Sequence, residues 1–295
     1  QAVYTAFQVA LNDGDEVLVP TPYWTTYPEA IKLAGGTQVD VFAGSDQDYK
    51  VTPEQLEAHY TPKTKALLMC SPNNPTGAVY SKAELEAIGK WALSKEGLWV
   101  ITDEIYQNLV YDGLKAYSIT ELVPELAERT MMVNGVAKSY AMTGWRLGWL
   151  IAPPDAAKAA ANLQSHLTSN VSNISQRAAI EAITGDQEPV RQMLEAFDRR
   201  RKTAVAELNK IEGIVTPTPE GAFYVYPDVS GLFGRDFGGR SFSSSLELAD
   251  FVLDEVEVAL VPGEAFGPSG YFRLSYALRD DQLLEGLQRL QTLFS

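Results

Sequence analysis

The sequence predicts an α/β protein in which a mostly parallel sheet is covered by helices on both faces, followed by a smaller α+β domain. Between residues 16 and 151, short apolar runs alternate with helix-forming segments. Such continuous runs are typical of parallel strands that are buried on both faces. From Pro189 the pattern changes to one long helix followed by short strands. We therefore expect a large domain over 1–188 and a small domain over 189–295 that begins with a long linking helix.

The elements of the large domain are set by apolar runs and by the turn and capping residues between them. A helical pattern at the start of the chain ends at a turn signal around Gly14. Two segments carry helix-start signals. Residues 52–53 place a proline at the first helical position, and residues 81–84 form a capping box. Strands are predicted at 16–19, 37–42, 65–70, 98–102, 130–133 and 147–151, and helices at 1–11, 26–34, from 52 onward and at 81–95.

The elements of the small domain are fewer and its strands are shorter. The long helix over 190–211 carries a basic cluster at 199–202, which we interpret as a solvated face. A glycine- and serine-rich segment over 231–245 is expected to be an exposed loop. Short strands, expected to pair antiparallel, are predicted at 222–226, 258–261 and 271–275, and helices at 245–255 and 280–293.

Charge and composition exclude several classes of function. The net charge of −14 argues against nucleic-acid binding through phosphate neutralisation. The single cysteine, Cys70, rules out an internal disulfide and favours a reducing compartment, which we expect to be the cytoplasm. No apolar run of 18 residues exists, so no membrane-spanning helix is expected. No metal site is predicted. The chain opens inside a helical pattern without an initiator methionine, so we expect a fragment.

The segment after the strand at 130–133 carries the most informative chemistry. Lys138 sits among small and hydroxyl residues, and Arg146 follows eight positions later. A lysine in an apolar setting can lose its proton near neutral pH, and the neutral amine can condense with an aldehyde. A nearby arginine can clamp a phosphate with its planar fork of donors. An amine beside a phosphate clamp is what a protein needs to hold pyridoxal phosphate. The alternative is a surface lysine beside a helix start.

Further polar and aromatic side chains follow other predicted strands, where open α/β sheets bind ligands. Asn74 lies in a rigid turn, although such turns are also common without a function. Asp103 and Tyr106 fit a carboxylate and a phenol beside a cofactor ring, or else a helix cap and a core residue. Trp24 can stack on a ring or be a buried aromatic residue, and Arg273 in an apolar strand needs an anionic partner.

The run AKSYAMTGWRLG at 137–148 closely resembles the lysine signature of class I aminotransferases, which belong to the pyridoxal-phosphate enzymes of fold type I. The resemblance extends to SPNNPTG at 71–77 and TDEIY at 102–106, in the family's order. It implies a seven-stranded sheet between helices, pyridoxal 5′-phosphate as the cofactor, and a division of the chain at the long helix. It also implies that Lys138 carries the cofactor and moves the substrate's α-proton, and that Arg146 holds the cofactor phosphate.

The same resemblance implies roles for the remaining residues. Asn74 and Tyr106 would contact the ring oxygen, and Asp103 the ring nitrogen. Trp24 would cover the ring face, and Arg273 would bind the substrate α-carboxylate. Trp24 and Asn74 would also face the substrate. A hydroxyl that some branches place three residues before the lysine is Gly135 here, so one phosphate contact would come from elsewhere.

Two longer runs, NLQSHLTSNVSN at 162–173 and VPGEAFG at 261–267, resemble bacterial aspartate aminotransferases. This implies transamination between L-aspartate and 2-oxoglutarate by a cytoplasmic homodimer. It also implies that residues upstream of this chain, and a second copy, complete the substrate pocket, so we expect the isolated fragment to be poorly active. Alternatives are an aminotransferase for aromatic amino acids, alanine or N-succinyl-diaminopimelate, a β-lyase of the same fold, and a non-catalytic sensor domain fused to a DNA-binding module.

Overall fold

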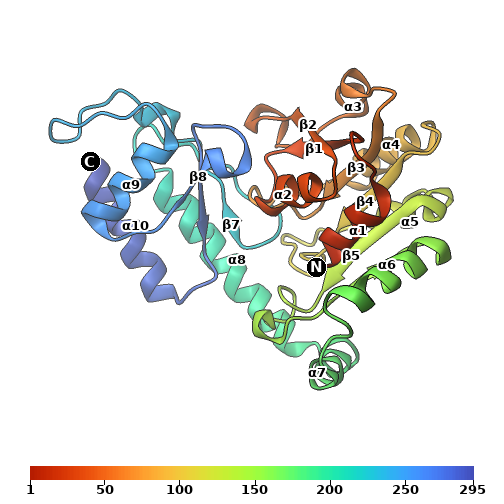
Figure 1. Ribbon diagram of the computed structural model, residues 1–295. Coiled ribbons are helices and arrows are strands. Elements are labelled where there is room, and N and C mark those ends of the chain that lie inside the picture. Colours follow the sequence, from red (N-terminus) through yellow and green to blue (C-terminus); the bar gives the residue numbers. More distant parts are fainter.

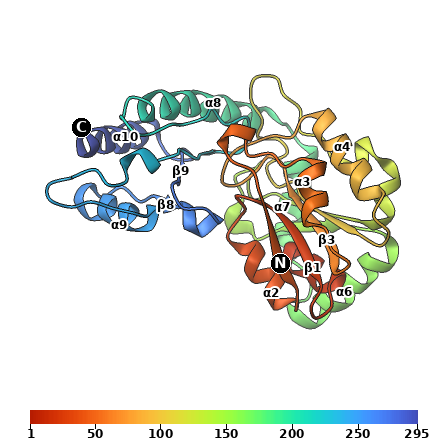
Figure 2. The same cartoon turned by 90° about the horizontal axis from the view of Figure 1, so that it is seen from above.

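The computed structural model describes residues 1–295 as two lobes, with the long helix α8 running from the first into the second (Figures 1 and 2). The first lobe is built on a six-stranded sheet in the order β2-β1-β3-β4-β5-β6. Every neighbouring pair is parallel except β5 with β6. The strands are β1 (Glu16–Thr21), β2 (Thr37–Phe42), β3 (Thr64–Cys70), β4 (Trp99–Asp103), β5 (Thr130–Gly135) and β6 (Gly148–Ile151).

The predicted α/β class with a mainly parallel sheet is confirmed, and each of the six apolar runs predicted as a strand between residues 16 and 151 forms one. The expected seventh strand is absent from the sheet of this chain. That number came from the family resemblance and had no apolar run behind it, because the sequence pattern itself supports six strands.

Alternate side chains of the strands enter two separate cores, as the two-residue period of a strand requires. Val17, Val19 and Leu68 pack in one core, with helices α1, α2 and α6. Leu18 and Leu67 pack in the other, with α3, α4 and α5. The sheet is therefore buried on both faces, which is why its strands read as continuous apolar runs. The helices of this lobe are α1 (Ala2–Ala10), α2 (Thr26–Leu33), α3 (Pro53–His59), α4 (Lys82–Leu93), α5 (Ile119–Leu122), α6 (Pro154–Leu167) and α7 (Asn173–Thr184).

The capping signals in the sequence mark true helix starts. Thr52 caps α3 and Ser81 caps α4, each through a complete capping box. By contrast, the sequence analysis assigned no helix to α5, α6 or α7. The two longer ones bury little: only Ala156 and Ala160 in α6, and Ser175 and Ala179 in α7. These buried residues are small, so no large apolar side chains mark the buried face of either helix in the sequence.

The second lobe is a three-stranded antiparallel sheet in the order β7-β9-β8, packed with three helices. Antiparallel pairing is confirmed, but β7 and β8 are shorter than predicted, and β8 begins where the predicted strand at 258–261 ends. The elements are α8 (Glu188–Leu208), β7 (Tyr224–Val225), α9 (Ser245–Val256), β8 (Val261–Pro262), β9 (Phe272–Ser275) and α10 (Asp280–Phe294). None of the helices in the structure is both long and apolar enough to cross a membrane.

The division of the chain into two domains at 188/189 stays a prediction. It is favoured because the second lobe has a hydrophobic core separate from the two cores of the first. The core of the second lobe is made mainly of residues after 188. It also includes Tyr106, Leu109 and Tyr111, which come from the loop after β4. This loop therefore ties the second lobe to the carboxyl edge of the first sheet.

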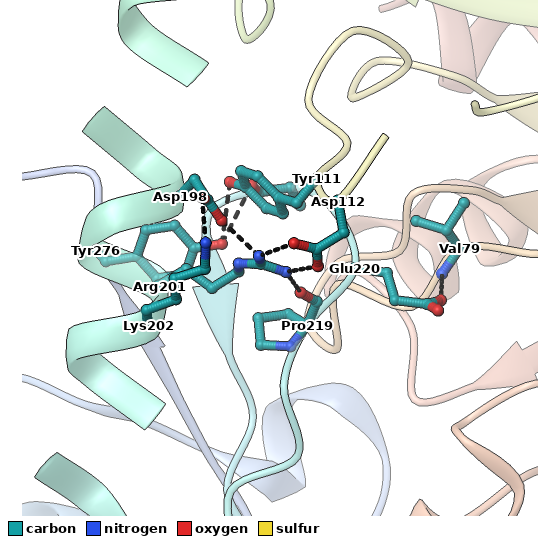
Figure 3. A network of polar contacts seen from close by, with 10 residues as sticks. Val79, Tyr111, Asp112, Asp198, Arg201, Lys202, Pro219, Glu220 and Tyr276 are labelled. Atoms are coloured by element: carbon teal, nitrogen blue, oxygen red, sulfur yellow. Dashed lines mark hydrogen bonds and ion pairs between the residues drawn. The ribbon is translucent and has the colours of Figure 1, made fainter. Parts of the chain in front are cut away.

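The interpretation of 199–202 as a solvated face is wrong for one residue. Arg201 is only 1% exposed and forms ion pairs with Asp112 and Asp198 (Figure 3). It lies on the inward face of α8 with Phe197 and Ala204, at helical spacing. A buried arginine is tolerated because its charge is paired and both of its terminal nitrogens donate hydrogen bonds.

Candidate active site

Four neighbouring parts of the sheet edge carry the predicted site residues. Strands β1, β3, β4 and β5 are adjacent and parallel, so their carboxyl ends lie along one edge. Trp24, Asn74 and Lys138 follow the ends of β1, β3 and β5, and Asp103 is the last residue of β4. The topology thus brings together side chains that are far apart in sequence, at the place where open α/β sheets bind ligands.

Lys138 lies in the loop between β5 and β6 and is half-buried. Its Nζ is 5.6 Å from the centroid of the Phe223 ring. Burial lowers the pKa of Lys138, and the positive charges of Arg273 and Arg146 lower it further, while Asp103 opposes them. The amine is therefore easier to deprotonate near neutral pH than an ordinary lysine, which suits a nucleophile or a general base.

Asp103 is 5% exposed and accepts hydrogen bonds from the Tyr27 hydroxyl at 2.8 Å and from the backbone N–H of Ile105 at 3.2 Å. Burial raises the pKa of this carboxyl, and the two donors and the charge of Lys138 act in the opposite direction. The sequence analysis missed Tyr27. The Trp24 ring meets the Tyr27 ring edge to face at 5.4 Å, so Trp24, Tyr27 and Asp103 form one contiguous group. The three-residue spacing from Trp24 to Tyr27 at a helix start was the available signal.

The turn that presents Asn74 is held from within and from outside. Asn73 Oδ1 accepts from the backbone N–H and the hydroxyl of Thr76, at 3.2 and 2.9 Å. The carbonyl of Gly77 accepts from the backbone N–H groups of Glu220 and Gly221, at 3.1 and 2.8 Å. Asn74 itself is 4% exposed. The amide is therefore fixed in place before any ligand arrives.

Arg273, on β9, reaches this edge from the second lobe. Its Nη1 donates to Asn74 Oδ1 at 2.9 Å. Its guanidinium carbon lies 4.6 Å from the Tyr224 ring centroid and 4.8 Å from that of Phe266. The Tyr224 and Tyr106 hydroxyls are 3.0 Å apart. Burial raises the pKa of Tyr106 well above its ordinary value, so this phenol stays protonated and can donate. The sequence analysis assigned no role to Tyr224.

Arg146 is exposed, with φ of 51° in the left-handed region, and its Nη1 donates to the Thr143 carbonyl at 2.8 Å. Its guanidinium donates one hydrogen bond, so its remaining donors can bind an anion. Arg146 forms no hydrogen bond with the other predicted site residues, and only its charge reaches Lys138.

The charges of the site are unbalanced. Lys138, Arg146 and Arg273 are cationic groups that act on one another, and Asp103 is the carboxylate among them. The side chain of Arg273 also has a buried Nε without a hydrogen-bond partner. In a protein of net charge −14, this local excess of positive charge suits an anionic ligand.

The model of one protein family, described as aminotransferase class I and II, matches residues 1–290. The chain belongs to this family. It is 58% identical, over all of its 295 residues, to the aspartate aminotransferase of Streptomyces avermitilis, of which it covers 72%. It is 45% identical, over 99% of its length, to the aspartate/prephenate aminotransferase of Cereibacter sphaeroides, of which it covers 73%. The crystal structure of the Rhizobium meliloti aspartate aminotransferase superimposes with a TM-score of 0.96 at 39% identity, covering 99% of this chain and 73% of that one.

The family resemblance and the α/β class predicted from the sequence are therefore confirmed. The roles of individual residues in this aminotransferase stay predictions. Hydrogen bonds or ring contacts link Arg273 with Asn74, and Tyr106 with Arg273 through Tyr224. Trp24 joins Asp103 only through Tyr27.

Proposed function

We propose that this aminotransferase binds pyridoxal 5′-phosphate and transfers the amino group of L-aspartate to 2-oxoglutarate, giving oxaloacetate and L-glutamate. The observation that carries the proposal is that adjacent strand ends bring Asn74, Asp103 and Lys138 to one sheet edge, where Arg273 donates to Asn74. The names of the similar proteins from Streptomyces avermitilis and Rhizobium meliloti support aspartate as the amino donor.

The residues present fit the cofactor. Arg146 suits its phosphate, and the buried carboxylate of Asp103 suits a protonated ring nitrogen. Asn74 uses its oxygen to accept from Arg273, which leaves its NH₂ group free to donate to a ring oxygen. When bound, the cofactor supplies an aldehyde that takes up the amino group and a ring that draws electrons from the substrate's α-carbon.

The chain's own residues then have separate tasks. Arg273 binds the substrate α-carboxylate, because its planar guanidinium is already held against two aromatic rings and keeps donors unused. Lys138 takes the proton from the substrate's α-carbon at Nζ, which its lowered pKa permits near neutral pH. Trp24 and Tyr27 shield the inner side of the site near Asp103 from water.

We also propose that the enzyme acts as a homodimer in a reducing compartment such as the cytoplasm. Large apolar side chains are exposed along α6 and α7: Leu167 is 46%, Ile174 75% and Ile180 53% exposed. Such a group of exposed apolar residues favours a protein interface. The one cysteine, Cys70, is a buried free thiol. Sedimentation of the full-length protein tests the dimer, and a monomer at micromolar concentration would count against it.

A panel of amino donors with 2-oxoglutarate tests the reaction in the full-length protein. We expect oxaloacetate from aspartate, a visible absorbance of the cofactor-loaded protein, and loss of both in Lys138→Ala. Lys158→Ala, at an exposed position on α6, is the matched control and should keep both. If Lys138→Ala turns over aspartate like the control, the assignment is wrong.

A second candidate is an aminotransferase that also accepts a ring-bearing oxo acid such as prephenate. The 45% identical Cereibacter sphaeroides protein, named for both activities, favours it. The same panel decides: amination of prephenate at a rate comparable with that of 2-oxoglutarate supports dual use, and its absence leaves the aspartate reaction alone.

A further inference from the structure

We propose that Arg201, on α8, is a positioning residue for the active site: it fixes the segment 219–224 so that Tyr224 supports Tyr106 and Phe223 lies beside Lys138. The proposal rests on the function proposed above. Arg201 lies outside the motifs that carry the family resemblance, and its surroundings were not visible in the sequence. The contacts that link it to the site are all formed within this chain.

Both terminal nitrogens of the Arg201 guanidinium donate two hydrogen bonds each (Figure 3). Its Nη1 donates to Asp112 Oδ2 and to the Pro219 carbonyl, both at 2.8 Å. Its Nη2 donates to Asp112 Oδ1 at 2.9 Å and to Asp198. The guanidinium carbon lies 4.4 Å from the centroid of the Tyr111 ring. A planar fork is needed for a bidentate carboxylate contact combined with stacking, and lysine cannot supply it.

The contact with Pro219 fixes the start of the segment, and the next residues are tied down one after another. The Tyr111 backbone N–H donates to the Glu220 carbonyl at 3.0 Å, and the Ala222 backbone N–H donates to the Leu109 carbonyl at 2.9 Å. The Tyr111 hydroxyl donates to the Ala222 carbonyl. Tyr111 therefore joins Arg201 to Ala222 directly, through its ring on one side and its hydroxyl on the other.

The contacts of Arg201 and Tyr111, which we call the clamp, leave the segment 219–224 little freedom to shift. Ala222 has φ of 56°, a conformation that residues with side chains rarely adopt. A Cβ atom on Gly221 would lie 2.6 Å from Pro72 Cβ and 2.9 Å from the Leu109 carbonyl oxygen. The backbone is thus packed against the turn that carries Asn74 and against the loop that follows Asp103. Its position depends on being held there, because the strained φ would relax if the contacts were lost.

Phe223 and Tyr224, the next two residues of the segment, contact the predicted site residues. The Phe223 ring lies 5.6 Å from Lys138 Nζ. Tyr224 shares a hydrogen bond with Tyr106 and stacks on Arg273. Each phenol carries one proton. When Tyr106 donates to the ring oxygen of the cofactor, Tyr224 must be the donor in their shared bond. Tyr224 then polarises Tyr106 and strengthens its donation, because hydrogen bonds in a chain reinforce one another.

Arg201→Met tests the proposal in the full-length, cofactor-loaded protein, with Arg199→Met as the matched control. Arg199 is the neighbour two positions away, and its side chain is 59% exposed in a surface ion pair with Asp280. Tyr224→Phe removes the hydroxyl and keeps the ring, so it tests the last step alone. Asp112→Asn removes the charge of one ion-pair partner of Arg201. Because the Asp112 side chain is 56% exposed, this variant serves if Arg201→Met does not fold.

We expect three results for Arg201→Met that the control does not show. Amide hydrogen exchange over 219–226 accelerates by about tenfold, measured without cofactor. The pH midpoint of the cofactor's visible absorbance rises by about 0.2 to 0.5 units, because a weaker donor stabilises the anionic ring oxygen less. The value of kcat falls about three- to tenfold with a smaller change in KM. Tyr224→Phe should reproduce the second and third results and leave the exchange unchanged.

The outcomes separate this proposal from the proposed function. If the wild-type protein shows no transamination, the proposed function fails, while the exchange comparison still decides whether Arg201 clamps 219–224. If the wild-type protein is active but Arg201→Met and Asp112→Asn match Arg199→Met in exchange, midpoint and kcat, the positioning role of Arg201 is refuted. A loss of thermal stability without a change in midpoint would make Arg201 a structural residue only, which also overturns the proposal.

Discussion

Replacing Tyr27 by phenylalanine removes one hydroxyl from beside a buried carboxylate and changes little else. Tyr27 is 1% exposed, and its hydroxyl donates to Asp103 Oδ2 at 2.8 Å. In the variant, Asp103 keeps one donor, the backbone N–H of Ile105 at 3.2 Å. A buried hydrogen bond to a charged group contributes about 1.5–3 kcal/mol, so we expect a loss of about 2 kcal/mol in the free energy of unfolding. For a chain of this size, that corresponds to about 4–8 °C in Tm.

The loss should depend on pH in a direction that the structure fixes. Burial already raises the pKa of Asp103, so its contribution to stability is present below its ordinary pKa and is lost as the pH rises through the folded-state value. The Tyr27 hydroxyl lowers this pKa, because it stabilises the charged form. Tyr27→Phe therefore raises the pKa of Asp103 further. The deficit of the variant should be smallest in acid, where the carboxyl is protonated, and should grow toward alkaline pH.

Thermal unfolding of the cofactor-free full-length protein between about pH 5 and about pH 8 measures this effect. Tyr60→Phe is the matched control, since Tyr60 packs edge to face on Trp91 and belongs to the core on the opposite face of the sheet from Tyr27. In the cofactor-loaded protein we expect about a tenfold lower kcat/KM, or about 1.4 kcal/mol in the barrier. A Tyr27→Phe deficit that equals that of the control, or that shrinks as the pH rises, would refute the reasoning.

The remaining predictions concern stability. Glu104 is 5% exposed, Oε2 has no hydrogen-bond partner, and burial raises its pKa, so its contribution to stability falls as the pH rises through that value. The Tm of Glu104→Gln relative to the wild type should therefore increase from about pH 5 to about pH 8, and a flat difference would contradict this. Gly221→Ala should cost about 2 kcal/mol in chemical denaturation, because the added Cβ meets Pro72 and a carbonyl oxygen. Gly286→Ala, in α10 with open space around it, should gain about 0.5–1 kcal/mol, and a loss there would show that the site is not open.

The strand-end logic made much of the site predictable from the sequence. Asn74, Asp103 and Lys138 each follow or end an apolar run that is unmistakably a buried parallel strand. Parallel strands in one sheet have their carboxyl ends at one edge, so local patterns were enough to bring these residues together. The capping boxes at Thr52 and Ser81 were predictable for the same reason, because their signals lie within four residues.

The contacts that the sequence did not disclose are long-range. Tyr27 and Asp103 are 76 residues apart, and Arg201 and Asp112 are 89 apart. No local pattern distinguishes Arg201 from its neighbours Arg199 and Arg200, since all three belong to one basic run. Only the helical phase of α8, with Phe197 and Ala204 on the inward face, selects it. In a basic run on a long helix, the buried arginine is therefore identified by its helical position relative to the apolar face, and the composition of the run does not reveal it.

The bond between Arg273 and Asn74 joins residues 199 apart and connects the second lobe to the sheet edge. The Asn74 amide is held by its turn, whereas Arg273 belongs to a short antiparallel sheet. An incoming α-carboxylate can take the guanidinium donors that the Asn74 oxygen leaves unused. The ties through Arg201, Tyr111 and Tyr224 do not involve the substrate, so they keep Phe223 beside Lys138 while Arg273 adjusts to its ligand.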